Sequence, residues 1–283
     1  MYACISSCVL VPGITGLFLF GLKPAVDFTG GTLLELHFQS PTTQSQITQI
    51  LAKDHIQAVG IQESSSLNYF VRLKPETDAT IASLEKTLSQ EKTNKVEIQS
   101  IETVGPVLGK ELLQKTVMAA IVAIIAILSY VAYAFKNIKF GVAAILALVH
   151  DLLVVLGTFA LLGHFLHVEV DTLFVTAFLT TMSFSVHDTI VVFDRIREML
   201  KRGDKLPFNE LCDKALTQTI GRSLANSLTI IFMLLALVLM GGTTVRWFVF
   251  ALLIGTISGT YSSDFIATPV LILWDRWEKR KKI

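Results

Sequence analysis

The sequence predicts a polytopic α-helical membrane protein with one α+β domain between its first two membrane helices. The chain has 283 residues, of which 52% are hydrophobic, and its mean hydropathy of +0.59 lies outside the range of soluble proteins. Six apolar stretches are long enough to cross a bilayer, which takes about 20 residues in a helix. A long polar stretch between the first two shows the periodicities of short strands and helices.

The first apolar stretch, residues 1–22, lacks a basic start and a convincing cleavage site, so we expect a retained transmembrane helix and not a removed signal peptide. Residues 115–283 are expected to form a membrane domain with five further spans. These lie at about 115–135, 140–163, 171–193, 220–240 and 246–273. The last span contains Pro269, which predicts a tilt, a kink or an early end.

Residues 23–114 are expected to form a small α+β domain. Alternating apolar residues predict strands at 33–38, 56–62, 69–73 and 96–101, and helical spacing predicts helices at 45–55 and 79–90. This order, βαββαβ, is typical of a ferredoxin-like domain. The segment has no cluster of cysteine, histidine or paired acidic residues that suggests catalysis, so we interpret it as a module that binds a partner or transmits force.

Basic residues are distributed unevenly over the short loops, and lysine and arginine mark the cytosolic side of a membrane protein. They gather between spans two and three, between spans four and five, and in the tail after the last span, whereas the opposite loops carry Arg246, His164 and His167. We therefore expect both termini in the cytosol and residues 23–114 in the periplasm of a bacterium with two membranes. The basic residues are Lys136, Lys139, Arg195, Arg197, Lys201, Arg202, Lys205, Lys214, Arg276, Lys279, Arg280, Lys281 and Lys282.

Several classes of function find no support. The net charge of +1 implies no general attraction to nucleic acid. The three cysteines have no metal-ligand spacing, and no cofactor is indicated. Residues 105–110 have three residues between their glycines and Glu111 after the lysine, whereas a Walker A loop needs four residues and then Lys-Ser or Lys-Thr. We interpret this stretch as a hinge into the second span, and residues 201–218 as a short cytosolic amphipathic segment.

Asp188, inside the apolar run of the fourth span, is the strongest candidate for a functional group, because an ionised carboxylate at that depth is costly. It is a candidate proton or ion carrier. The alternative is a structural carboxyl that stays protonated and hydrogen-bonds to a neighbouring helix. Thr181 and Ser185 share its face by helical spacing.

A second polar stripe lies on the fifth span and contains Thr219, Arg222, Asn226 and Thr229 at helical spacing. We expect this stripe to face inward, so that Arg222 meets Asp188. The alternative for Arg222 is a boundary position from which its side chain extends to lipid headgroups.

Further polar residues interrupt other apolar stretches. His150 and Asp151, near the middle of span three, are candidates for a proton relay or for a polar contact between helices. Asp264 follows the pair Gly255 and Gly259, which allows close helix approach, and it is a candidate member of the polar core. His187 is a candidate for tuning Asp188 or for hydrogen-bonding to an adjacent helix.

Five stretches resemble motifs of the SecD/SecF family. Residues 26–32 (VDFTGGT) resemble the signature that follows the first span, and residues 185–198 (SVHDTIVVFDRIRE) and 218–223 (QTIGRS) resemble the SecF motifs of spans four and five. Residues 149–151 (VHD) and 259–263 (GTYSS) match further SecF patterns. The motifs run through nearly the whole chain, so it is identified as a member of this family, which belongs to the RND superfamily. His187 stands where the family usually has asparagine, and Asp264 where it usually has an apolar residue.

The resemblance implies a function beyond what the residue patterns establish. It implies a SecF-type subunit of the inner membrane, separate or fused to SecD, that works with SecD and the SecYEG channel. Such proteins use the proton-motive force to help unfolded, exported polypeptides leave the channel. The family's proton-carrying aspartate corresponds to Asp188, and its arginine in the next span corresponds to Arg222.

We therefore expect a non-enzymatic helper of protein secretion, in which protonation of Asp188 removes its attraction to Arg222 and lets the helices repack. One alternative is an RND-like proton-coupled exporter of lipid or small molecules, which would need a substrate pocket in the outer domain. A second is an intramembrane hydrolase using His150 and Asp151, for which the sequence offers no metal-ligand set or positioned nucleophile. A third is a passive scaffold for SecD.

Overall fold

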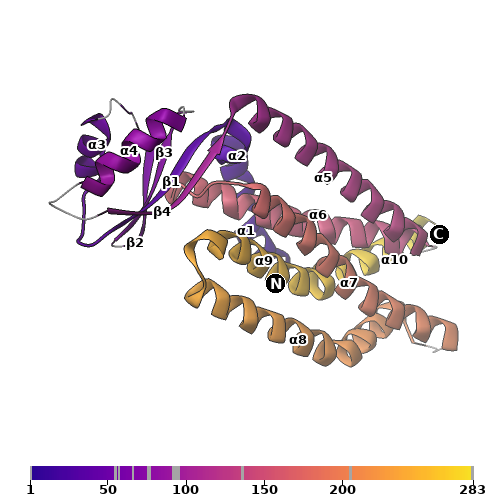
Figure 1. Ribbon diagram of the computed structural model, residues 1–283. Helices are drawn as coiled ribbons and strands as arrows, with labels where there is room; N and C mark the ends of the chain where they lie inside the picture. Colours follow the sequence, from indigo (N-terminus) through magenta and orange to yellow (C-terminus); the bar gives the residue numbers. More distant parts are fainter. Residues whose placement is uncertain are drawn as a thin grey trace. The chain divides into compact units, whose positions relative to one another are not determined.

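The computed structural model describes residues 2–53, 56, 58–65, 67–74, 78–90, 96–134, 137–203 and 206–281. The chain divides into two compact units, one of Met1–Lys23 with Ala119–Ile283 and one of Pro24–Met118. The first, the membrane unit, consists of helices, and the second, the α+β unit, contains the sheet (Figure 1). Lys136, Lys205 and Lys282, which belong to the expected basic loops, and His55, the end of an expected helix, lie outside the described residues.

The unit of Pro24–Met118 contains a four-stranded antiparallel sheet of strand order β2-β3-β1-β4. The expected strands and helices are all present, and their ends differ from the expected ones by at most three residues. The elements are α2 (Val26–Thr29), β1 (Gly31–Phe38), α3 (Gln44–Lys53), β2 (Ala58–Ser65), β3 (Asn68–Leu73), α4 (Asp78–Gln90) and β4 (Val96–Val104).

The core of this unit follows from the period-two pattern of its strands. Leu34, Leu36 and Phe38 of β1 are fully buried and pack in one cluster with Leu51 of α3 and Leu84 of α4. Alternate residues of a strand point to opposite faces, so a single face of the sheet meets the helices. Tyr69 on β3 belongs to the same cluster, its hydroxyl donates to the carbonyl oxygen of Thr42, and burial raises the pKa of this phenol.

The Gly-Gly sequence after α2 is required by close backbone contacts. Gly31 has φ +139°, and a Cβ there would lie 2.8 Å from the carbonyl oxygen of Leu73. A Cβ on Gly109 of α5 would lie 2.9 Å from the nitrogen of Gly30. Glycine allows such approaches, so this segment joins the sheet to the start of α5 without side chains between them.

Five stretches of the described chain are long and apolar enough to cross a membrane: Val107–Val131, Ile138–Phe165, Thr172–Arg202, Phe208–Met240 and Val245–Arg280. A shorter apolar helix covers Cys4–Phe20. The helical elements are α1 (Tyr2–Phe20), α5 (Pro106–Ala134), α6 (Ile138–Phe165), α7 (Thr172–Arg202), α8 (Phe208–Met240), α9 (Thr243–Ser262), the π-helical turn η1 (Ser263–Ala267) and α10 (Thr268–Lys281).

Two expectations about these helices are wrong, and of the three outcomes left open at Pro269 the early end is not observed. The stretch 105–110 is not a hinge, because α5 already begins at Pro106, and proline is favoured at a first helical position. The described part of residues 201–218 is not a separate helix, because residues 201–202 end α7 and residues 208–218 begin α8. The last span does not end at Pro269. The chain passes through the wide turn of η1, and the proline, which has no N–H to donate, follows at the second position of α10.

Glycines bring the helices of the membrane unit close together. A Cβ on Gly157 of α6 would lie 2.5 Å from Cα of Gly13 in α1, and a Cβ on Gly255 of α9 would lie 2.2 Å from Thr181 of α7. A Cβ on Gly259 would lie 3.1 Å from Cα of Ser185. The expected close approach at the 255 and 259 pair is therefore confirmed, and it places the polar side chains of α7 and α9 within reach of each other.

Candidate functional site

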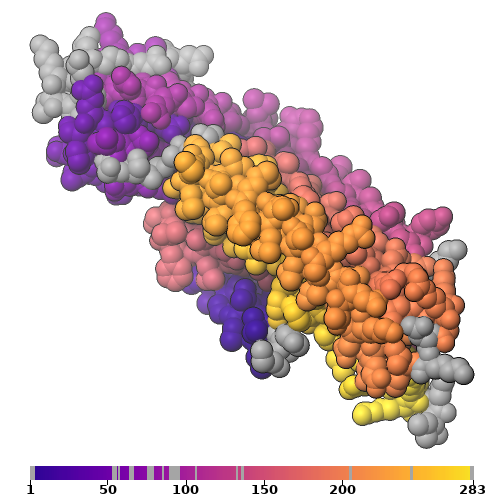
Figure 2. All heavy atoms as spheres, turned by 90° about the horizontal axis from the view of Figure 1, so that it is seen from below, coloured from indigo at the N-terminus to yellow at the C-terminus, as the bar shows by residue number. Residues whose placement is uncertain are grey.

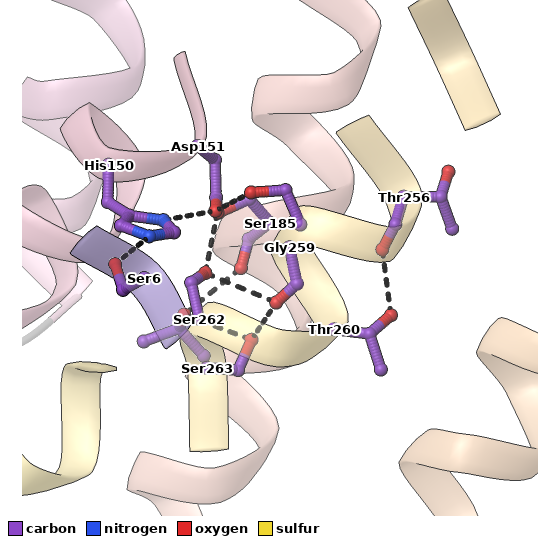
Figure 3. Close-up of polar contacts among 11 residues, drawn as sticks. Ser6, His150, Asp151, Ser185, Thr256, Gly259, Thr260, Ser262 and Ser263 are labelled. Carbon is purple, nitrogen blue, oxygen red and sulfur yellow. Dashed lines mark hydrogen bonds and ion pairs between the residues drawn. The ribbon is translucent and has the colours of Figure 1, made fainter. Parts of the chain in front are cut away.

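The polar side chains inside the membrane unit form two clusters, and the first is centred on Asp151 of α6. Oδ1 of Asp151 accepts a hydrogen bond of 2.6 Å from Ser258, and Oδ2 accepts bonds of 2.6 Å from Ser185 and from Ser262. Nδ1 of His150 lies 3.0 Å from Oδ1. Figure 3 shows His150, Ser185 and Ser262 converging on this carboxylate. Asp151 therefore connects α6, α7 and α9.

His150 extends this cluster to α1. Its Nε2 lies 2.6 Å from Oγ of Ser6 (Figure 3). An ionised carboxylate only accepts hydrogen bonds, so Nδ1 of His150 is the donor to Asp151, and in a neutral ring Nε2 then accepts the Ser6 hydroxyl. A carboxylate offers about four acceptor sites, and the three hydroxyls and Nδ1–H fill them. This saturation supports the interpretation of His150 and Asp151 as a polar contact that holds helices together.

The second cluster surrounds Asp188 of α7, which is half-buried and has unused acceptor capacity. Oγ of Ser227 in α8 donates to its Oδ2 at 3.3 Å. The side chain lines a cavity of about 20 Å³ between α7, α8 and α9, which is enough for one water molecule. The other polar residues that line this cavity are His187, Asn226, Ser227, Thr256 and Thr260. Asp188 therefore has an acceptor oxygen beside a space for water, whereas the oxygens of Asp151 are occupied.

The expected contact between Asp188 and Arg222 is not formed. Arg222 is exposed, and among the described residues it has no ion pair with Asp188. The buried polar stripe of α8 consists of Thr219, Ser223 and Ser227, so the inward face lies one residue, or about 100°, from the expected one. Many of the larger apolar residues of α8 are exposed, among them Leu228, Phe232 and Met240, and Figure 2 shows this helix in orange along one face of the membrane unit.

The other expected site residues are divided between the two clusters. Ser185 bonds to Asp151, and Thr181 is buried with its hydroxyl bonded to the carbonyl oxygen of Phe178, so neither joins Asp188. His187 and Asn226 are exposed at the rim of the cavity. Asp264 lies apart from the Asp151 cluster, in η1, with 3% of its surface exposed.

Sequence reasoning missed the serines that complete both clusters. Ser258 and Ser262 are four residues apart and alternate with Gly255 and Gly259, so this spacing would have placed them at the close contact with α7. Ser6 gives no comparable signal, because its partner His150 lies 144 positions along the chain.

A bundle of apolar helices with carboxylates among its packed faces, joined to a small α+β unit, defines a polytopic membrane protein with polar sites inside its membrane region. The comparisons with known proteins specify the family. The family described as "Protein export membrane protein SecD/SecF, C-terminal" matches residues 84–277, and the SecD/SecF GG motif matches residues 15–42. The chain belongs to the SecD/SecF family.

Its relatives include translocase subunits of nearly the same length. The protein translocase subunit SecF of Thermobaculum terrenum is 41% identical over 96% of this chain and 90% of its own length. That of Anaerolinea thermophila is 36% identical over 99% of this chain and 93% of its own length. The crystal structure of SecDF, a translocon-associated membrane protein from Thermus thermophilus, matches with a TM-score of 0.87 and 34% identity over 96% of this chain and 37% of that one.

Proposed function

We propose that this chain is a SecF-type subunit of a protein translocase, which uses the proton-motive force to promote export of polypeptides across the inner membrane and is not itself an enzyme. The family and the translocase relatives support the role in protein export. The observation that carries the proton coupling is Asp188, a half-buried carboxyl among membrane helices with free acceptor capacity beside a cavity for water. An ionisable residue in that position is a functional candidate by default.

The topology that this function requires has six spans, with α1 as the first and both termini in the cytosol. Residues 1–22 and 115–283 form the membrane domain, and residues 23–114 form a ferredoxin-like periplasmic domain. The packing of α1 on α6 through Gly13 and Gly157 supports the first span. The element order βαββαβ and the strand order β2-β3-β1-β4 support the domain type.

The proposed partners are SecD, the SecYEG channel and unfolded polypeptides in transit. The fused SecDF relative, of whose chain this one spans 37%, supports SecD as the missing half of the machine. Apolar side chains along α5, among them Val117, Ile121 and Ile125, are exposed and need a cover of lipid or of partner helices.

The proposed cycle uses Asp188 and Arg222 as an alternating pair. When Asp188 is ionised it attracts Arg222, and a turn of α8 by about 100° would bring Arg222 to the position that Ser223 holds here. When Asp188 is protonated this attraction disappears, and α8 returns to the arrangement with Ser227 next to the carboxyl. Because α5 continues from the membrane unit into the α+β unit, helix movement can reach the domain that handles the polypeptide.

Asp188→Asn tests this function, because the amide keeps the size of the side chain and can still form hydrogen bonds, but it cannot bind and release a proton as a carboxyl does. In cells without the native copy, the variant should reach normal membrane levels and lose the export that depends on the proton-motive force. The matched control is Asp213→Asn at an exposed position of α8, which should leave export unchanged. Full export with Asp188→Asn would exclude the proposed coupling, and lipid transport by vesicles containing the purified chain would favour an RND-like exporter.

A further inference from the structure

Asp264 is a buried carboxyl that has no hydrogen-bond partner among the described residues. Only 3% of its surface is exposed, and its Oδ1 is fully enclosed without a donor. The carboxylate of Asp151, which is buried to a similar extent, has four hydrogen-bond partners. An ionised carboxylate without a partner is costly in a membrane interior, and a buried polar atom without a partner calls for a functional explanation.

The backbone at Asp264 places it on a turn that packs against the turn of Asp188. Asp264 lies in the π-helical turn η1, and such turns are rare and often occur at functional sites. Oγ1 of Thr189 in α7 lies 3.5 Å from Oγ of Ser263, and the latter donates to the carbonyl oxygen of Gly259 at 2.6 Å (Figure 3). Asp188 precedes Thr189 and Asp264 follows Ser263, so the bonded pair holds the two carboxyls on adjoining turns.

The other ionisable groups on the elements around η1 are exposed or contact partners other than Asp264. The turn packs against α1, α6, α7, α9 and α10. Among the described residues, no lysine, arginine or histidine forms an ion pair with Asp264. The remaining groups are Cys4 and Cys8 on α1 (exposed), His150 and Asp151 on α6 (bonded to each other), His187 on α7 (exposed), Tyr261 on α9 (its ring beside those of His150 and Phe265) and Asp275 on α10 (paired with Lys139 and Lys279).

We propose that Asp264 is a second proton-binding group of the membrane unit and that it exchanges a proton with Asp188. The inference rests on the proposed function, in which Asp188 carries a proton. In the exchange, the O–H bond of one carboxyl breaks as an O–H bond forms on the other carboxylate. The negative charge moves in the opposite direction, and no other reactant is consumed.

The physical basis is repulsion between two carboxylates in a medium that screens charge poorly. Such neighbours cannot both remain ionised at little cost, so they take up and release protons as a coupled pair. Asp264 is the better proton store, since it is more deeply buried and has no donor to stabilise its ionised form. Asp188 is the entry point, because it lines the cavity.

The test is an infrared titration of the full-length chain in lipid bilayers, which follows the carbonyl band of protonated buried carboxyls. The wild-type chain should show the bands of two carboxyls. Asp264→Asn should remove about half of the total intensity and change the midpoint of the band that remains, since a coupled partner has been lost. Asp264→Leu, which suits an apolar position, should give the same loss, and Asp213→Asn should give none.

The outcomes separate this inference from the function on which it rests. If both Asp264 variants keep the full intensity and the wild-type midpoint, Asp264 binds no proton and the inference is overturned, while the Asp188 band preserves the proposed function. If instead Asp188→Asn leaves the bands unchanged, Asp188 carries no proton, and the proposed coupling and the exchange are both excluded.

Discussion

At the scale of single residues, the aspartates of the membrane unit differ in how far their oxygens are satisfied. Asp151 accepts three hydroxyls and one ring N–H, Asp188 accepts one hydroxyl at 3.3 Å, and Asp264 has no donor for Oδ1. A saturated carboxylate resists any change that would remove a donor, because each unsatisfied buried group is costly. The satisfied oxygens of Asp151 fit a structural role, whereas those of Asp188 and Asp264 fit the proton-binding role proposed for them.

Asp151→Asn should destabilise the membrane unit. The amide places N–H donors where serine hydroxyls now donate, so at least one buried hydroxyl loses its acceptor, at a cost of about 1–3 kcal/mol. Thermal unfolding of the purified chain in detergent should show a lower midpoint. Ser185→Ala, which removes a single donor, should lower it less, and Asp213→Asn at an exposed position should not lower it. Equal midpoints for the three variants would contradict the structural role of Asp151.

The same residues show how much of the site could be predicted from the sequence. Polar residues within apolar runs can be recognised from the sequence alone, so Asp188, Asp151 and Asp264 are all predicted as candidates. Their contact partners cannot be predicted in this way, because an error of one residue rotates the inward face of a helix by about 100° and exchanges Arg222 for Ser223. Contacts such as that of Ser6 with His150 depend on how distant helices pack, which no local pattern encodes.

At the scale of elements, the sequence predicts the interiors of helices and strands better than their ends. Interiors follow the apolar periodicity, whereas the ends of α7 and α8 extend beyond the apolar runs. A tertiary contact and a local ion pair stabilise these extensions: Nε of Arg195 on α7 donates to Oε1 of Gln218 on α8 at 2.9 Å, and within α7 Arg197 pairs with Asp194 at 3.2 Å. A hydropathy window detects neither contact.

Gly157→Ala should weaken the packing of α1 on α6. The added Cβ would lie 2.5 Å from Cα of Gly13, so the backbones must separate, and overpacking of this kind costs about 1–3 kcal/mol. The matched control is Gly141→Ala on the same helix, where a Cβ meets nothing within 4 Å and alanine is the better helix former. Hydrogen exchange by mass spectrometry should be faster in α1 for the first variant only. Unchanged exchange in α1 would show that the contact contributes little.

Gly31→Ala tests the Gly-Gly segment. Its φ of +139° is unfavourable for alanine, and the new Cβ would lie 2.8 Å from the carbonyl oxygen of Leu73, so we expect a loss of about 1–3 kcal/mol in the α+β unit. Gly60→Ala in β2 is the control, because its Cβ meets nothing within 4 Å. Exchange of the amides in β1 and β3 should be faster in Gly31→Ala than in Gly60→Ala. Similar exchange in both would mean that the segment tolerates a side chain.

At the scale of the whole molecule, the two units differ in the kind of residues that they bury. The membrane unit holds the carboxyls that we propose to bind protons, and the unit of Pro24–Met118 has a conventional apolar core under one face of its sheet. The chain crosses between them twice, after Lys23 and within α5. The proposed coupling of proton movement to export requires the α+β unit to lie on the side of the membrane where the polypeptide emerges. The orientation of the chain in the membrane therefore tests the proposed function.

The orientation can be measured with single cysteines in a chain whose Cys4, Cys8 and Cys212 have been replaced by serine or alanine. Gly60→Cys places a thiol on an exposed strand of the α+β unit, and Leu206→Cys places one at an exposed position between α7 and α8. The basic residues Arg195, Arg197, Lys201 and Arg202 near the second position should keep it in the cytosol. A membrane-impermeant maleimide added to cells with a permeabilised outer membrane should therefore label Gly60→Cys, and should label Leu206→Cys only after lysis. The reverse pattern would place the α+β unit in the cytosol, where it could not act on a polypeptide leaving the channel.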